Sequence, residues 1–204
     1  MSNIKKIFDF LHEVEGLKSS TRYCRTKTGR QESTAEHSWR LSLMVPIVAK
    51  ELSLNLDVNH AIKLAIFHDL AEAVTGDIDA ITIAKGDVSR DEKRKLEIVA
   101  MNKLKNLLPE DLGKEIYDLW HEYDNSTSKE AKFIKALDKI ETVTQLVEAG
   151  YKTYDDADFI PNYPDKAVSD FPELKVMLKE LKKRLKEEFE KGNIPWKEEY
   201  DKLE

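Results

Sequence analysis

The sequence contains little cysteine, no long apolar run and no excess of positive charge. It has one cysteine, Cys24, among 204 residues, which excludes an internal disulfide and any metal site built from a cysteine cluster. The longest apolar run, residues 43–49, is far shorter than the about 20 residues that a membrane-spanning helix needs. Residues 1–10 lack the apolar stretch and cleavage site of a secretory signal. We therefore expect a cytoplasmic protein that has no membrane segment and whose metal ligands are histidines and carboxylates.

The charge balance argues against a general nucleic-acid-binding protein. There are 33 Lys and Arg residues against 39 Asp and Glu residues, and the formal net charge is -6. Because general nucleic-acid-binding proteins usually carry a basic excess, we expect no nucleic-acid partner. A local exception is the basic segment 18–30, which holds no acidic residue and contains Lys18, Arg22, Arg25, Lys27 and Arg30. This segment is a candidate contact for an anionic ligand, and the alternative is a solvated loop.

Apolar residues recur at helical spacing along most of the chain. This pattern predicts helices over residues 4–14, 34–52, 58–74, 96–108, 109–123, 127–150 and 173–191. Two of these helices are expected to begin with capping boxes, at Ser33 and Thr127, where a glutamate follows three residues later. Pro46 is expected to kink or split the second helix, because proline removes a backbone donor. The alternation over residues 78–84 is too short and isolated to be a convincing strand, so we expect an all-α helical bundle.

The length and the 41% content of apolar residues are typical of one domain with a substantial core. We expect residues 1–150 to form that core and residues 151–204 to form a C-terminal helical arm packed on the same domain. The charged amphipathic helix over 173–191 could pack against a second subunit, and we expect a homodimer. An exposed arm is an equal alternative for this helix.

Several polar residues interrupt the apolar faces of the predicted helices. His68 and Asp69 lie in strongly apolar surroundings, and Glu72 follows His68 by four residues, which would place both on one helix face. His37 and Asp138 lie within two further predicted helices. Two histidines and two aspartates form a plausible ligand set for one divalent transition metal, such as Mn, Fe, Co, Ni or Zn. From spacing alone, hydrogen-bonded polar residues in the core are an equally open alternative.

The blocks around these residues resemble a known family. The blocks 36–38, 68–78 and 137–141 are similar to those of the HD-domain metal-dependent phosphohydrolases, and within them to the bacterial 5′-deoxynucleotidases and the HD-domain-containing protein 2 group. The resemblance covers residues 1–150 and implies an all-α HD fold that hydrolyses deoxyribonucleoside 5′-monophosphates to deoxynucleoside and phosphate. It also implies that one divalent metal is held by His37, His68, Asp69 and Asp138.

The same resemblance implies roles for four more residues. Glu72 would lie beside the attacking water or the leaving oxygen, and Arg22 would orient the phosphate. Asp77 would face the sugar and accept hydrogen bonds from its hydroxyls. Tyr23 stands where the family has a tryptophan, a departure that still allows an aromatic wall but weakens the expectation of an identical substrate preference.

Two other functions stay open at this point. The same metal site could hydrolyse nucleoside triphosphates or phosphodiesters. A non-catalytic, metal-stabilised helical binding module is the other alternative. Glu72 and Asp77 argue against that module, because a metal that only stabilises the fold needs neither of them.

Overall fold

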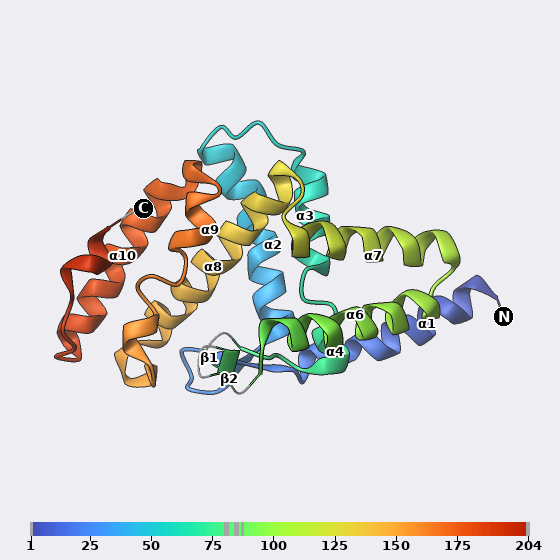
Figure 1. The fold of residues 1–204 in the computed structure, drawn as a ribbon, viewed down its shortest axis with the longest axis horizontal. Helices are drawn as coiled ribbons and strands as arrows, with labels where there is room; N and C mark the ends of the chain where they lie inside the picture. The colour runs from blue at the N-terminus through green and yellow to red at the C-terminus, as the bar shows by residue number, and fades with distance from the viewer. Residues whose placement is uncertain (1, 80–81, 84–85, 87, 203–204) are drawn as a thin grey trace.

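The computed structural model describes residues 2–79, 82–83, 86 and 88–202, and helices dominate it, as the sequence predicts. In Figure 1, α8 crosses the middle of the molecule, with α9 and α10 on one side and α1, α6 and α7 on the other. The helices are α1 (Asn3–Val14), α2 (Thr34–Glu51), α3 (Val58–Phe67), α4 (Glu72–Thr75), α6 (Arg90–Leu107), α7 (Glu110–Asn125), α8 (Lys129–Ala149), α9 (Asp165–Ser169) and α10 (Lys175–Lys191).

A two-stranded antiparallel hairpin corrects the expectation that the chain has no convincing strand. Strand β1 (Thr21–Arg25) pairs with β2 (Gln31–Ser33), and Gly29, with a φ of 86°, lies in the connecting turn. The buried positions of β1 are Arg22 and Cys24, and one of them is charged. Buried and exposed positions therefore alternate along the strand, but apolar and polar residues do not. For this reason the apolar periodicity of the sequence does not predict the strand. Of the residues 78–84, positions 80, 81 and 84 lie outside the described residues.

The helix predicted over 58–74 is interrupted. Helix α3 ends at Phe67, a turn occupies residues 68–71, and α4 begins at Glu72. In the turn, the backbone N–H of Glu72 donates to the carbonyl of Asp69 at 3.0 Å, an i to i+3 bond. The expectation that His68 and Glu72 share a face of one helix is therefore wrong. Consecutive residues of a regular helix point about 100° apart, so leaving the helix allows His68 and Asp69 to face one site.

The predicted helix starts and breaks were partly right. The capping box at Ser33 is confirmed, with both of its hydrogen bonds present. The one expected at Thr127 is wrong, because Ser128 caps α8. Glu130 instead accepts a hydrogen bond from a backbone N–H in the loop before α3, which takes its carboxylate away from the box. Helix α2 runs through Pro46 without splitting.

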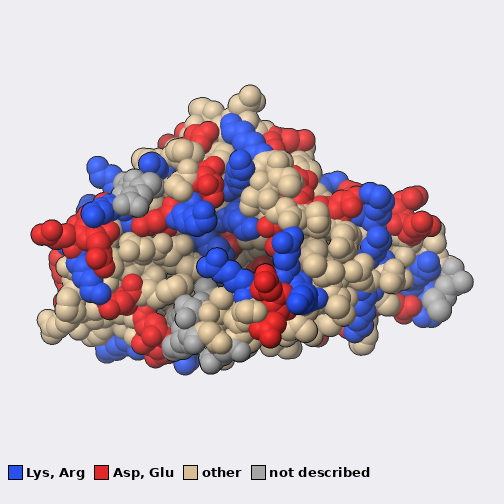
Figure 2. All heavy atoms as spheres, in the orientation of Figure 1, with Lys and Arg blue, Asp and Glu red and all other residues tan. Residues whose placement is uncertain are grey.

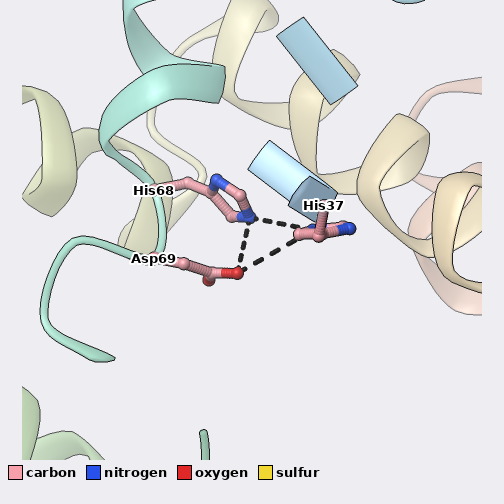
Figure 3. Close-up of side chains that lie close together, drawn as sticks. All are labelled: His37, His68 and Asp69. Carbon is pink, nitrogen blue, oxygen red and sulfur yellow. Dashed lines mark hydrogen bonds and ion pairs between the residues drawn. The ribbon is translucent and has the colours of Figure 1, made fainter. Parts of the chain in front are cut away.

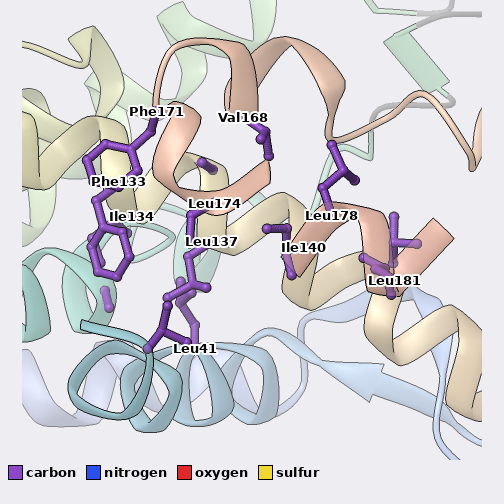
Figure 4. Packing of buried hydrophobic residues seen from close by; sticks show 14 of the residues in the cluster. Leu41, Phe133, Ile134, Leu137, Ile140, Val168, Phe171, Leu174, Leu178 and Leu181 are labelled. Atoms are coloured by element: carbon purple, nitrogen blue, oxygen red, sulfur yellow. The ribbon is translucent and has the colours of Figure 1, made fainter. Parts of the chain in front are cut away.

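The core is built around α8. Phe133, Leu137 and Ile140 of α8 are at most 2% exposed and belong to one buried cluster with Leu41 of α2 and Leu178 of α10 (Figure 4). Burying each such side chain contributes about 1.5–3 kcal/mol. The C-terminal helices thus share a core with α8.

A second buried cluster joins α1, α6 and α7 through side chains such as Phe10, Leu104 and Trp120. None of the helices in the described part of the chain combines the length and the apolar content that a bilayer span requires.

Candidate active site

Four predicted metal ligands from three separate segments lie close together. His37 is the fourth residue of α2, His68 and Asp69 come from the turn after α3, and Asp138 comes from the middle of α8. Figure 3 shows His37, His68 and Asp69 pointing toward one another. The Nε2 atoms of the two histidines are 3.3 Å apart, and Asp69 Oδ2 is 2.9 Å from His68 Nε2 and 3.8 Å from His37 Nε2. Asp138 Oδ1 lies 3.2 Å from His37 Nε2.

This donor set fits a divalent transition metal. The ligating atoms of His37, His68 and Asp69 all lie within 4.8 Å of one another, and imidazole and carboxylate donors suit such ions. Without a metal, burial and the charge of Arg22 lower the pKa of His37, but the acids around it outweigh them and raise that pKa to about 10. The cluster therefore attracts positive charge, which a proton supplies in the metal-free chain and a metal ion would supply in its place.

Glu72, the first residue of α4, is a buried carboxyl group beside this cluster and is 4% exposed. Thr34 Oγ1 donates a hydrogen bond of 2.9 Å to Glu72 Oε2, and Lys93 Nζ lies 4.0 Å from Glu72 Oε1. Burial raises the pKa of Glu72 well above its ordinary value, and the nearby charges of Asp69 and Asp77 raise it further. This environment favours the protonated form of the carboxyl group, which is the form that can donate a proton.

Asp77 is positioned by the turn that ends α4. Gly76, with a φ of 72°, adopts a backbone conformation that a side chain disfavours and so redirects the chain toward Asp77. Lys93 Nζ donates a 2.8 Å hydrogen bond to the carbonyl of Ile78, which ties this loop to α6. Burial raises the pKa of Asp77, although the charge of Arg22 opposes that shift.

Arg22 and Tyr23 reach the site from β1. Arg22 is 9% exposed, its Nη1 lies 3.3 Å from Asp69 Oδ2, and its Nη2 donates to Thr142 Oγ1 at 3.1 Å. Tyr23 Oη accepts a 2.9 Å hydrogen bond from the backbone N–H of Asp155, so it links the hairpin to the C-terminal segment. The other basic residues of segment 18–30 are exposed to solvent, which agrees with the alternative that this segment is solvated rather than a ligand contact. They are Lys18, Arg25, Lys27 and Arg30.

These groups line a cavity of about 340 Å³, within the usual size range of small-molecule sites. Figure 2 shows that one face of the molecule is hollowed near its middle, where Lys and Arg side chains gather. The cavity thus combines acids with basic and apolar side chains. Its lining includes Arg22, Tyr23, His68, Asp69, Glu72, Asp77, Lys93, Asp138, Lys139, Phe159, Ile160 and Tyr163, whereas His37 is fully buried.

The model of the HD domain family matches residues 14–161 of this chain. The chain belongs to the HD domain family. It is 34% identical over 185 residues to the 5′-deoxynucleotidase HDDC2 of Homo sapiens, a match that covers 87% of this chain and 85% of that relative. It is 39% identical over 146 residues to the protein of the same name from Bos taurus, covering 71% and 68% of the two chains.

A crystal structure described as a predicted metal-dependent phosphohydrolase, from Magnetospirillum magnetotacticum, has the same fold. The two structures superpose with a TM-score of 0.79 over 96% of this chain and 100% of the other, at 23% sequence identity. The family resemblance and the fold expected from it are therefore confirmed.

Sequence reasoning missed the side chains of this HD domain that hold the predicted ligands in place. Tyr123 Oη donates a 2.7 Å hydrogen bond to Asp138 Oδ2, and Lys139 Nζ lies 2.9 Å from the same oxygen. Burial disfavours the charged form of Asp138, but Lys139 and His37 hold its pKa well below the ordinary value. With Oδ2 engaged, Oδ1 is left to face His37. Lys139 and Glu141 lie within a block that carries the family resemblance, which is the signal that could have drawn attention to them.

Proposed function

We propose that this HD-domain protein is a metal-dependent 5′-deoxynucleotidase, which hydrolyses deoxyribonucleoside 5′-monophosphates to deoxynucleoside and phosphate. The observation that carries the proposal is the buried Glu72 beside the His–Asp cluster, in one cavity with Arg22 and Asp77. The two relatives from Homo sapiens and Bos taurus, both named 5′-deoxynucleotidase, support the same reaction.

The metal centre of this proposal consists of one divalent transition metal, Mn, Co, Fe, Ni or Zn, held by His37, His68, Asp69 and Asp138. When bound, such a metal supplies a Lewis acid that withdraws charge from the phosphoryl group. The convergence of the two Nε2 atoms and the Asp69 carboxylate supports this assignment.

The residues of the chain then orient the substrate and supply the proton. Phosphoryl transfer depends mainly on positioning and on neutralising charge, and the guanidinium of Arg22 binds the phosphate oxygens for this purpose. Glu72 gives its proton to the leaving 5′ oxygen, a role that its raised pKa supports. Asp77 accepts a hydrogen bond from the sugar, and Tyr23 forms the aromatic wall beside it. Both side chains line the cavity.

Phosphate release from deoxyribonucleoside and ribonucleoside monophosphates, measured side by side with each of the five metals, tests the proposal. We expect turnover of the deoxyribonucleotides with at least one metal. A folded, metal-loaded protein that is inactive on all of them refutes the proposal. Release from a triphosphate or a phosphodiester instead would establish the alternative hydrolase. Tight binding without any hydrolysis would establish the binding module.

We further propose that the protein is a cytoplasmic homodimer with no nucleic-acid or membrane partner. The apolar side of α10 packs on its own chain through Leu178, Leu181 and Leu185, so that side is not free for a second subunit. An exposed apolar row on α2 is a better contact, since Trp39 and Ile47 are 67% and 59% exposed and lie two helical turns apart. Sedimentation equilibrium should give twice the chain mass for the native protein and one chain mass for Trp39→Glu. A native monomer refutes this contact.

A further inference from the structure

A second layer of buried charges lies behind His37. Glu141, on α8 one turn after Asp138, is 0% exposed, and its Oε2 pairs with His37 Nδ1. The other carboxylate oxygen, Oε1, accepts a 2.6 Å hydrogen bond from Nε of Arg40 on α2. Arg40 Nη1 in turn donates to Glu148 at 2.8 Å, and the Glu148 side chain is 37% exposed. These contacts form a continuous path from the predicted metal site to the surface.

The geometry leaves Glu141 no freedom to turn away from His37. A buried carboxylate without partners is costly, and here each oxygen has one, so rotating the side chain would break two charge-assisted bonds. When a metal replaces the second ring proton, the bond at Nδ1 would keep the remaining proton on that nitrogen. The lone pair of Nε2, which faces His68 and the two aspartates, would then be free to bind the metal. A carboxylate in this position also makes the imidazole a stronger electron donor.

The other histidine is held differently. His68 Nδ1 faces the neutral carbonyl oxygen of Ala65 at 2.9 Å, so no carboxylate strengthens this ligand from behind. The two imidazoles are therefore unequal, and His37 is the one whose donor strength depends on a neighbouring charge. This difference makes Glu141 the point at which the chain can set how strongly the site holds a metal.

We propose that Glu141 is a positioning residue that sets metal affinity through His37, and that Arg40 acts on the metal only through Glu141. The inference rests on the proposed metal site but not on the proposed substrate. Partners of this kind typically contribute 10- to 100-fold to metal affinity.

The test measures the affinity of the purified, metal-free full chain for Co²⁺ alone, by calorimetry and by the visible absorption of bound Co²⁺. We expect Glu141→Gln, which keeps the shape but removes the charge, to weaken binding about 10- to 100-fold and to alter the Co²⁺ spectrum. Glu180→Gln is the matched control. It neutralises an exposed glutamate that accepts from Arg184 at 2.9 Å, and should leave affinity and spectrum unchanged. Wild-type affinity and spectrum in Glu141→Gln would overturn the proposal.

A double-mutant cycle tests the role of Arg40. Arg40→Met should weaken Co²⁺ binding in the native background and should have little further effect when Glu141 is already glutamine. If the losses of Co²⁺ affinity in the two single variants add fully in the double variant, Arg40 acts independently of Glu141. That result would overturn this half of the proposal.

Circular dichroism of each metal-free variant verifies folding. Glu141→Asp is a second variant that keeps the charge, and it should bind Co²⁺ more tightly than Glu141→Gln. The reverse order would overturn the proposal. Because no substrate is present, a protein that binds Co²⁺ as expected but hydrolyses no deoxynucleotide would refute the proposed function and leave this inference standing.

Discussion

Replacing Glu72 by glutamine removes the acidic proton of the carboxyl group and leaves the shape of the side chain nearly unchanged. The amide oxygen of the introduced glutamine can still accept the hydrogen bond that Thr34 Oγ1 donates to Glu72 at 2.9 Å, and the two side chains have nearly the same volume. Among the described residues, no hydrogen bond joins the side chain of Glu72 to a predicted metal ligand. We therefore expect Glu72→Gln to fold, to bind metal normally and to change in unfolding free energy by no more than about 1 kcal/mol.

The expected loss is in the chemical step. Burial is the largest cause of the raised pKa of Glu72, and burial persists when a metal neutralises the charge of Asp69. Burial therefore favours the protonated carboxyl group, which is the form that the proposed protonation of the leaving oxygen requires. General acid catalysis typically contributes 10²- to 10⁴-fold, which corresponds to about 2.7–5.4 kcal/mol of barrier. We expect kcat of Glu72→Gln to fall by this factor while KM changes little.

A modified substrate separates the two proton-transfer roles. In a deoxynucleotide whose bridging 5′ oxygen is replaced by sulfur, the leaving thiolate needs little protonation, because thiols ionise near pH 8.5. If Glu72 protonates the leaving group, the kcat ratio of native protein to Glu72→Gln should shrink toward one for the sulfur substrate. If Glu72 instead removes a proton from water, kcat of Glu72→Gln should fall by the same factor on both substrates.

Single-turnover rates and metal content, measured on the same samples, complete the assay. A metal-loaded Glu72→Gln with native kcat on the oxygen substrate would refute any role for Glu72 in proton transfer. Equal losses on both substrates would refute the leaving-group role. The pH profile gives a further check, since an acid catalyst loses activity as pH rises through its raised pKa, whereas a base gains it.

Three further outcomes follow from the structure. Asp77→Ala should lower the kcat/KM ratio of deoxyribonucleotide to ribonucleotide at least tenfold, and an unchanged ratio would remove Asp77 from sugar recognition. Leu104→Ala, at a fully buried position outside the lining of the cavity, should reduce the unfolding free energy in urea by about 2–5 kcal/mol without changing metal affinity. In the metal-free protein, the pKa of His37 lies near 10 against 6.5 for the free side chain, so its contribution to stability is complete below pH 6.5 and is lost as pH rises toward 10. Urea unfolding at pH 6.5 and pH 9.5 measures this loss, and equal metal-free stability at the two values would contradict it.

The helices and the candidate ligands could be predicted because each has a local signal. A stripe of apolar residues at helical spacing predicts the helix whatever lies against it, and His68 and Asp69 stand out because their neighbours are apolar. The hairpin and the turn at 68–71 have no such signal. Arg22 occupies an inward position of β1 because it pairs with Asp69 across 47 residues of sequence, and a local pattern does not contain that partner.

The side chains that hold the ligands show where local reasoning ends. Arg40 follows His37 by three residues and Glu141 follows Asp138 by three, so the i,i+3 rule places each charge on the same helix face as a candidate ligand. On a surface helix that spacing is common and carries no information. It becomes informative only when α2 and α8 pack with these faces together, because the charges are then buried and must satisfy one another. A charged residue one turn from a candidate metal ligand therefore predicts that the neighbouring helix carries a partner of opposite charge. Glu141→Gln tests whether such a pair affects the metal site.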